Sequence, residues 1–524
     1  MTKRILSLCL VLVLLLGVLA GCSKSETKTD DTDPAAQTDA ATETTSQYAY
    51  QPQYFDLPED IQWIGSTCVS GDTLYFTASV PDGGKETYTD ETGAEVSYDT
   101  YSEVIFRFDL DTGECVKLDN YVAEPVVEDP EGANGVTMGQ DGSMQVFNSS
   151  TNIQTMAPGS DGTIWLFRQT NSYADDGTEG TSISELIQLD AHGTLLRTIT
   201  PTEEESADET DSWRYTYIDT ILSDDKGYVY TYDYQTVNVY GPDGSFVFSK
   251  SGDELNGQFC QLSESEVGIT ASSADGKMIF RQLDPETKDW GKETPVSSRA
   301  WNILPGNDVY AYFFMDNGNI FGERRDNGEV EKVVDWVACD VDSNNINSDQ
   351  FGFLSDGRIV AVTYDYSDDG PSKQQILVLN RVDAASVTAK TELTLACLYL
   401  DYNLRSQIVK FNKSNPDYRI VVKDYSEYAT DDDYNAGLTK LNTEIISGNV
   451  PDILVNGTEL PIGQYAAKGL LEDLYPWIDA DETLSRTDFT QNLLRALETN
   501  GALYRLPQTY LLETPMGLPE TVGG

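Results

Sequence analysis

Histidine is almost missing from this chain of 524 residues. The only one, His192, lies in the turn Asp-Ala-His-Gly at residues 190–193. A Ser-His-Asp triad needs a histidine beside its nucleophile, and most zinc sites use histidine or clustered cysteine. The sequence therefore argues against both kinds of site. His192 is expected to be a solvated turn residue.

Cysteine is also scarce, with seven in the chain and no Cys-x-x-Cys pair. Five lie beyond the N-terminal region, all isolated: Cys68, Cys115, Cys260, Cys339 and Cys397. An odd number of scattered cysteines does not fit a disulfide framework, and a free cysteine behaves as a small buried hydrophobic residue. We expect these five to be free, mostly buried thiols.

Basic residues are few: 34 Lys and Arg stand against 87 Asp and Glu, for a formal net charge of -53. Such a surface repels phosphate backbones, so nucleic acid is disfavoured as a partner. The charge favours solubility and says little about the fold.

Only one long apolar run occurs, at residues 5–16, directly after Lys3 and Arg4. This run is shorter than the roughly 20 residues that cross a membrane. A short apolar run after basic residues is typical of a signal peptide, which would cover residues 1–21. Residues 19–22, Leu-Ala-Gly-Cys, resemble a bacterial lipobox. The resemblance implies cleavage before Cys22 and lipidation of its thiol, with a further acyl chain such as palmitate. Two such lipid signals anchor a protein stably at the outer face of the cell membrane.

Residues 22–47 are mostly Ser, Thr, Asp, Glu, Ala and Lys, and contain no aromatic residue. Such a segment cannot bury enough apolar surface to fold, so we expect a disordered tether between the lipid and the folded part.

Residues 48–385 repeat one pattern, in which an Asp, Asn and Gly turn precedes alternating apolar and aromatic residues. The six copies are residues 71–76, 160–165, 225–230, 274–279, 316–321 and 355–360. Asp-Gly and Asn-Gly suit hairpin turns with positive φ, and the alternation suits a half-buried strand. A second turn follows at residues 111–113, 190–193, 242–244 and 326–328. Each unit has two turns, and the later units recur about every 40 to 50 residues, while the earlier ones are spaced more widely, consistent with inserted loops. This pattern predicts an all-β propeller of six to eight blades, with a β-sandwich as the alternative.

Two motifs in this region suggest chemistry without meeting its requirements. Residues 160–165, Ser-Asp-Gly-Thr-Ile-Trp, resemble the Asp-box of sialidase-like propellers but depart from its spacing, so we interpret them as a turn with a packed tryptophan. Residues 340–344 have the opening spacing of a calcium loop, but Asn345 and Phe351 replace its glycine and its final glutamate. The sequence predicts no metal site, no cofactor and no enzymatic constellation here.

The pattern changes after residue 390. Residues 393–400 form a nearly continuous apolar run, followed by an amphipathic helix capped by Asn403 and by a second strand at residues 418–422. A helix ending at Gly448 and a third strand at residues 451–455 follow. The order β-α-β-α-β predicts a parallel α/β sheet over residues 391–524.

Four segments in this region resemble the extracellular solute-binding proteins of ABC importers, especially the sugar-binding group. They are residues 411–420 (FNKSNPDYRI), 444–454 (EIISGNVPDIL), 468–474 (KGLLEDL) and 500–507 (NGALYRLP). The resemblance implies a periplasmic-binding-protein-like lobe, with a small-molecule solute and ABC permease subunits as partners. Solute-binding proteins of this type need roughly 300 to 400 residues for two lobes, and 134 are present after residue 390, so the resemblance implies an incomplete lobe.

Ligands of open α/β sheets bind at the carboxyl ends of the strands, near the switch in strand order. The resemblance implies that the loops there face a cleft that closes around a solute. A sugar needs flat apolar faces together with carboxylate or amide groups for its hydroxyls. The residues of these types in the loops are Asp401, Tyr402, Asn456, Glu459, Gln508, Tyr510 and Glu513.

These features predict a lipid-anchored binding protein that captures a carbohydrate for an ABC importer and is not an enzyme. One alternative is a propeller-borne glycan hydrolase or lyase, in which loss of a single carboxylate would abolish turnover. The other is a surface sensor or adhesin, in which the α/β part signals to a partner.

Overall fold

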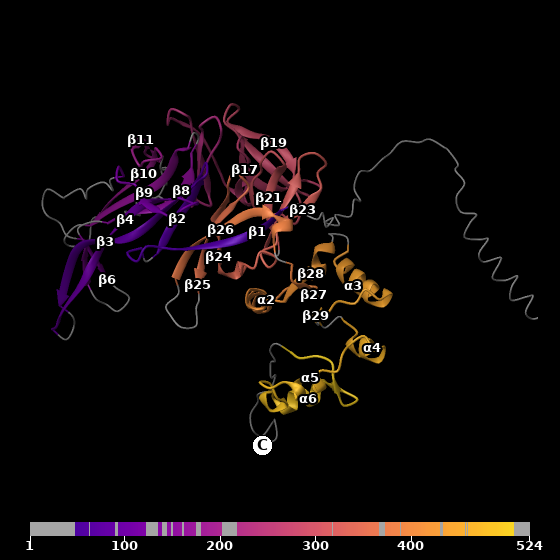
Figure 1. The fold of residues 1–524 in the computed structure, drawn as a ribbon. Helices are drawn as coiled ribbons and strands as arrows, with labels where there is room; N and C mark the ends of the chain where they lie inside the picture. Colours follow the sequence, from indigo (N-terminus) through magenta and orange to yellow (C-terminus); the bar gives the residue numbers. More distant parts are fainter. Residues whose placement is uncertain are drawn as a thin grey trace, which may run out of the picture. The chain divides into compact units, whose positions relative to one another are not determined.

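Short β-strands dominate the first part of the chain in the computed structural model, and helices α2 to α6 occur only after it (Figure 1). The structure describes residues 48–61, 63–89, 93–121, 135–138, 144–147, 150–159, 162–173, 180–201, 217–316, 318–365, 373–387, 389–429, 433–455, 457 and 460–507. The predicted signal peptide, Cys22 and the predicted tether lie outside these residues. None of the described helices is both long and apolar enough to span a membrane.

Six four-stranded antiparallel sheets follow one another along the chain. Blade 1 consists of β2 (Ile64–Ser70), β3 (Thr73–Thr89), β4 (Glu95–Phe108) and β5 (Cys115–Lys117). Blade 2 consists of β8 (Ser150–Pro158), β9 (Ile164–Tyr173), β10 (Gly180–Leu189) and β11 (Leu195–Ile199). Blade 3 consists of β12 (Thr220–Ser223), β13 (Val229–Tyr232), β14 (Thr236–Tyr240) and β15 (Phe246–Ser251). Blade 4 consists of β16 (Phe259–Ser263), β17 (Glu266–Ser272), β18 (Met278–Asp284) and β19 (Asp289–Pro295). Blade 5 consists of β20 (Trp301–Pro305), β21 (Tyr310–Asp316), β22 (Asn319–Arg324) and β23 (Val330–Val334). Blade 6 consists of β24 (Ile346–Phe353), β25 (Ile359–Asp365), β26 (Lys373–Asp383) and β1 (Tyr48–Asp56). The hairpin of β6 (Gly135–Met138) and β7 (Met144–Phe147) lies between blades 1 and 2 in sequence.

The first strand of each blade lies on the inside of a ring. Strands β2, β8, β12, β16 and β20 are neighbours in this order, and β24 lies beside β2. The N-terminal strand β1 is the outermost strand of blade 6, where it pairs antiparallel with β26 from Tyr48↔Asp383 to Asp56↔Gln375. The chain therefore forms a six-bladed β-propeller whose last blade combines strands from its two ends.

The predicted number of six units is confirmed, although the units are not all in register. The turns before residues 74, 163, 228 and 358 join the first strand of a blade to the second. Those at residues 274–277 and 316–318 instead join the second strand to the third, in blades 4 and 5. The same Asp-Gly and Asn-Gly chemistry suits either hairpin, so the sequence pattern alone does not distinguish them.

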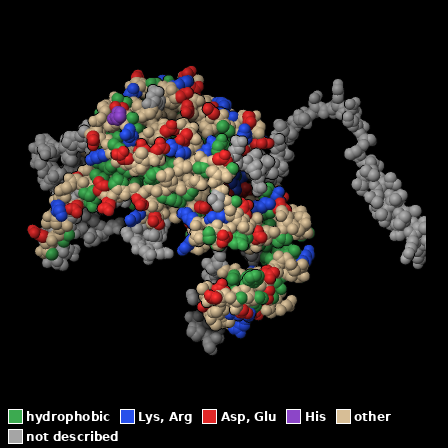
Figure 2. All heavy atoms as spheres, viewed as in Figure 1, with side chains coloured by type: hydrophobic (Ala, Val, Ile, Leu, Met, Phe, Trp, Pro, Cys, Tyr) green, Lys and Arg blue, Asp and Glu red, His purple; other side chains and the backbone are tan. Residues whose placement is uncertain are grey.

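Aromatic and branched side chains fill the spaces between neighbouring blades. Phe313 of blade 5 stacks on Phe353 of blade 6 with ring centroids 4.2 Å apart, a contact worth about 0.5–1.5 kcal/mol beyond burial. Trp165 is only 2% exposed and packs between blades 2 and 3, as the interpretation of its motif as structural predicts. Figure 2 shows charged side chains of both signs spread over the visible face of the propeller, with hydrophobic ones between them.

The cysteines and the histidine take the predicted structural roles. All five described cysteines are free, and only Cys115 is partly exposed. Burial raises the pKa of the Cys68 thiol to about 12, which keeps the thiol protonated and unreactive at neutral pH. His192 is exposed in its turn, where its backbone N–H donates to Asp190 Oδ1 at 2.8 Å.

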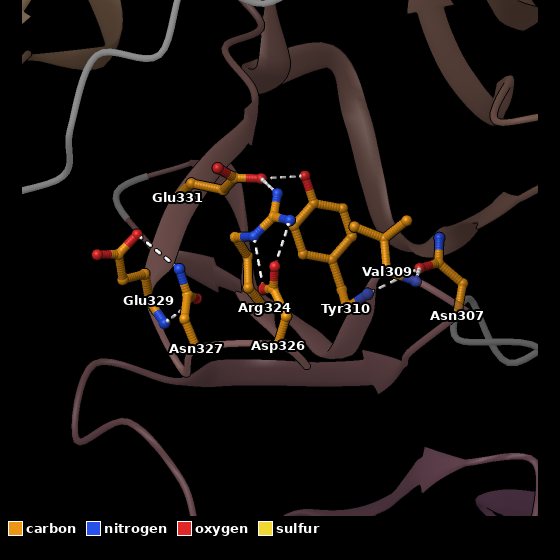
Figure 3. A network of polar contacts seen from close by, with 8 residues as sticks. All are labelled: Asn307, Val309, Tyr310, Arg324, Asp326, Asn327, Glu329 and Glu331. Carbon is orange, nitrogen blue, oxygen red and sulfur yellow. Dashed lines mark hydrogen bonds and ion pairs between the residues drawn. The ribbon is translucent and has the colours of Figure 1, made fainter.

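Polar side chains fix the ends of the hairpins of blade 5 (Figure 3). The Arg324 guanidinium contacts both oxygens of Asp326, at 2.9 and 3.0 Å, and its Nη1 lies 3.4 Å from Glu331 Oε1. Tyr310 donates to the same Glu331 oxygen at 2.5 Å. Asn307 Oδ1 accepts the backbone N–H of Tyr310 at 2.9 Å, which fixes the turn before β21. Tyr310 is therefore held at the start of β21, where it pairs with Arg324 of β22 and binds Glu331 of β23.

The predicted β-α-β-α-β order is confirmed in the C-terminal segment. Its elements are β27 (Thr391–Cys397), α2 (Tyr402–Ser414), β28 (Tyr418–Asp424), η5 (Tyr425–Tyr428), α3 (Ala436–Ser447) and β29 (Ile453–Leu454). Strand β27 is central and pairs in parallel with β28 on one side and with β29 on the other. The helix α3 ends at Gly448 with φ 97°, as the sequence predicts. Further elements are α4 (Ile462–Ala467), α5 (Tyr475–Ala480), η6 (Arg486–Asp488), α6 (Gln491–Leu497), β30 (Glu498–Thr499) and β31 (Ala502–Leu503).

Candidate functional site

Two of the predicted site residues lie near the carboxyl end of the central strand, β27. Asp401 and Tyr402 lie at the start of α2, after the short loop that follows β27. The sheet order β28-β27-β29 places the switch in strand order between β27 and β29. Ligands of open α/β sheets bind beside such a switch. Asn456, Glu459, Gln508, Tyr510 and Glu513 lie outside the described residues.

Asp401 caps the helix α2. Its Oδ1 accepts the backbone N–H groups of Asn403 at 2.9 Å and Leu404 at 3.4 Å. The prediction that Asn403 is the cap was wrong, because Asp401 has the extended backbone of an N-cap residue and Asn403 already lies inside the helix. One oxygen of this predicted ligand-binding carboxylate is thus committed to holding the helix.

Tyr402 is the first residue of α2 and is 61% exposed, and Tyr399 beside it is 66% exposed. Both line a pocket of about 270 Å³, which we call the tyrosine pocket. Its lining residues are Gly318, Asn344, Tyr399, Leu400, Tyr402, Arg405 and Asp424. The pocket combines two aromatic rings with an amide, a guanidinium and a carboxylate, which are the groups that recognise a polyhydroxylated ligand.

Asn344 and Gly318 reach the tyrosine pocket from the propeller. The side-chain amide of Asn344 donates to the backbone oxygen of Tyr402 at 2.8 Å and to Ser406 Oγ at 3.1 Å. Gly318 has φ 74°, and a Cβ there would lie 2.7 Å from Arg405 Nη1. The positive φ favours glycine at this turn, and the absence of a Cβ leaves room for the Arg405 guanidinium.

Further contacts hold the α/β sheet against the segment between blades 5 and 6, within one compact unit, Ala40–Gly524. Val337 packs in the same core as Leu395 and Cys397, and Arg405 Nη1 donates to Ser343 Oγ at 2.9 Å. Lys332 lies 2.7 Å from Glu427 Oε1. Burial raises the pKa of the Glu427 carboxyl, and the Lys332 ammonium opposes this rise.

A second, larger cavity of about 980 Å³ lies on the β29 side, and we call it the aliphatic groove. Leu395, Leu454 and Ile462 are among its lining residues, with Asp401 and Glu472 also in the lining. Its lining is mainly aliphatic. Asp401 and Tyr402 are therefore neighbours in sequence that line different cavities, which the sequence analysis did not foresee.

Residues in the segments that resemble the solute-binding family form hydrogen bonds between elements of the fold. The buried amide of Asn412 donates to the backbone oxygen of Ile420 at 3.0 Å and accepts its N–H at 2.7 Å. Asp452 Oδ2 accepts the N–H of Thr394 at 2.8 Å, and Asp473 Oδ1 accepts that of Leu503 at 3.0 Å. These residues join strands and helices, so the matched motifs bear on the fold more than on a ligand.

The acidic residues 340–344 are used within the protein. Asp342 caps the short helix η3 (Ser343–Asn345), and Asp340 lies 3.4 Å from Arg419. Across the described part of the chain, no three His, Cys, Asp or Glu residues are grouped so that they could hold a metal ion.

Sequence reasoning missed several residues of the tyrosine pocket. Tyr399 and Asp424 follow from the rule that pointed to Tyr402, since they lie at the carboxyl ends of β27 and β28. Gly318 and Asn344 had no such signal, because more than 50 residues separate them from α2.

Comparison with known proteins assigns this chain to no family. No family model matches the chain, and no curated protein matches it. Among solved structures, it is similar to the β-propeller domain of the Trilobed protease from Pyrococcus furiosus (9% identity, 61% of this chain and 82% of that chain, TM-score 0.26). It is also similar to YCF48 from Cyanidioschyzon merolae (9% identity, 63% and 99%, TM-score 0.32). A third is the extracellular domain of a putative hybrid two-component system from B. thetaiotaomicron (11% identity, 66% and 45%, TM-score 0.26). These TM-scores support no argument about function.

Proposed function

We propose that this chain is a solute-capture protein that binds a carbohydrate in the tyrosine pocket and delivers it to an ABC permease. In this proposal residues 391–524 are part of a binding-protein-like lobe. Cys22 carries the lipid anchor, and the protein works at the extracellular face of the cell membrane. The observation that carries the proposal is the tyrosine pocket itself, at the carboxyl ends of parallel strands.

The chemistry of the pocket favours a sugar over other small solutes. Tyr399 and Tyr402 are more than half exposed, and so offer ring faces on which a pyranose can stack. Asp424 and Asn344 supply acceptor oxygens for hydroxyl groups, and Arg405 supplies donors. The aliphatic groove is less suited to a sugar, since Leu, Ile and Val side chains form no hydrogen bonds with hydroxyls.

Calorimetric titration of the full chain with mono- and oligosaccharides tests the proposal. Tyr402→Ala removes one stacking face worth about 0.5–1.5 kcal/mol, so we expect saccharide affinity to fall by roughly two- to tenfold. Asn344→Ala should weaken binding too, although Asn344 belongs to the propeller. Tyr434→Ala is the matched control, because Tyr434 is 88% exposed and absent from the pocket lining.

Two results would contradict this function. One is a wild-type chain that binds no saccharide in the panel. The other is a Tyr402→Ala variant that binds as tightly as the Tyr434→Ala control.

A further inference from the structure

Two exposed tyrosines lie side by side on blade 3 of the propeller, away from the lining of the tyrosine pocket. Tyr217 precedes β12, and Tyr234 occupies the turn between β13 and β14. They are 44% and 61% exposed. Their ring centroids are 6.3 Å apart and their planes differ by only 15°. We call these two residues the Tyr217–Tyr234 pair.

A single carboxylate holds both rings in place. The hydroxyls of Tyr217 and Tyr234 donate to Asp219 Oδ1, at 3.2 and 2.5 Å. Asp219 Oδ2 accepts from Thr220 Oγ1 at 2.8 Å, which fixes the carboxylate in turn. Tyr232 contacts the Tyr234 ring edge-on at 5.6 Å. The rings are thus ordered before any ligand arrives, which lowers the entropy lost on binding.

The backbone of Tyr234 is in a costly conformation. Its φ is 72°, in the left-handed region that L-residues other than glycine, asparagine and aspartate rarely adopt. Turns at Gly227, Gly244 and Gly276 use glycine for φ values of 81–83°. Glycine would meet the backbone requirement of this turn without strain, so the turn itself does not call for an exposed aromatic residue. A strained residue that presents an exposed ring is the pattern of a ligand contact.

We propose that the Tyr217–Tyr234 pair is a glycan-binding site on the propeller, specific for a neutral polysaccharide. Near-parallel tyrosine rings suit the apolar faces of successive pyranose units. The Asp219 carboxylate suits sugar hydroxyls as donors. The net charge of -53 disfavours acidic glycans. This site goes beyond the proposed solute pocket and does not depend on it.

A proline-rich peptide is the other ligand that docks on exposed aromatic rings. It offers mainly carbonyl acceptors, whereas Asp219 is itself an acceptor and both tyrosine hydroxyls already donate to it. Asp219 Oδ2 accepts from Thr220 and can accept one further hydrogen bond, which a sugar hydroxyl can donate. The observations therefore favour a glycan.

Affinity electrophoresis of the full chain through gels containing starch, β-1,3-glucan, xylan or mannan tests the site. We expect at least one of these to retard the wild-type protein. Tyr234→Gly removes the ring and also relieves the left-handed strain, so misfolding is not expected. Its dissociation constant for that polysaccharide should rise roughly tenfold. Tyr217→Ala should act in the same direction, and Tyr234→Phe, which keeps the ring, should retain most of the binding.

Tyr101→Ala is the matched control on the propeller, since Tyr101 on β4 is 46% exposed. The proposal is overturned if none of the four polysaccharides retards the wild-type chain, or if Tyr234→Gly migrates like Tyr101→Ala. It is also overturned if a proline-rich peptide, and no glycan, loses affinity in Tyr234→Gly. Calorimetry with small saccharides tests the tyrosine pocket separately, so either site can fail while the other stands.

Discussion

Asn412 shows how one side chain can hold the edge of a sheet. It is fully buried in α2, yet its amide pairs with both backbone groups of Ile420, as a neighbouring strand would. The strand β28 has its only strand partner among the described residues in β27, so Asn412 completes its hydrogen bonding on the other side.

Replacing Asn412 with Ala should therefore loosen β28. Two part-buried backbone groups of Ile420 would lose their partner, at a cost of up to about 1–3 kcal/mol. Hydrogen exchange measured by mass spectrometry should show faster exchange in residues 418–424, by roughly five- to hundredfold. Asn403→Ala, an exposed change on the same helix, should leave that exchange unaltered. Equal exchange in the two variants would remove this role from Asn412.

At the scale of elements, β1 joins the two ends of the propeller. All nine of its residues pair with β26, and Phe55 packs edge-on against Phe108 of blade 1 at 5.4 Å. Blade 6 therefore depends on a strand that is about 320 residues away in sequence. This non-local pairing closes the ring together with the contact of β24 with β2, which favours cooperative unfolding of the propeller.

Deleting residues 48–56 should destabilise the propeller as a whole. The outer edge of β26 would be left unpaired and open to aggregation. We expect the Tm in calorimetry to fall by several degrees, because each lost kcal/mol lowers Tm by about 2–4 °C in a domain of 150–250 residues and by less in a larger domain such as this one. Deletion of residues 39–47 keeps β1 and is the control. A deletion of residues 48–56 that leaves Tm unchanged would show that the ring does not need β1.

At the scale of the whole molecule, hydrogen-bonded aspartates in the turns link stability to pH. Backbone N–H donors hold the pKa of Asp109 and of Asp190 below the ordinary value of 3.8, and the Ser355 hydroxyl does the same for Asp72. A carboxyl with a lowered folded-state pKa contributes stability above its unfolded-state pKa, and that contribution is lost as pH falls through the folded-state value. Asp224 has the opposite effect on the pH dependence of stability, because burial raises the pKa of its carboxyl.

We therefore expect the propeller to lose stability as pH falls from about 4 towards 2. Acidification also reduces the repulsion that a net charge of -53 produces at neutral pH, which partly offsets the loss. Urea unfolding in 0.5 M salt, where that repulsion is screened, should isolate the effect of the turns. Asp109→Asn should flatten the acid limb of the curve. A free energy of unfolding that does not change between pH 4 and 2 would contradict the prediction.

The sequence determined what depends on local spacing. Asp-Gly and Asn-Gly turns gave six repeated units and a range of six to eight blades, and Gly448 marked the end of α3, because turn residues act within a few positions of the chain. The rule for the carboxyl ends of parallel strands also pointed to Tyr402, which lines the tyrosine pocket. The tertiary structure alone decided what depends on distant segments. It placed β1 in the last blade and brought Asn344 to Tyr402. It also showed that Asp401 and Tyr402 line different cavities and that Tyr217 lies beside Tyr234. Loop closure and packing between blades leave no periodic pattern in the sequence, so the sequence did not reveal these contacts.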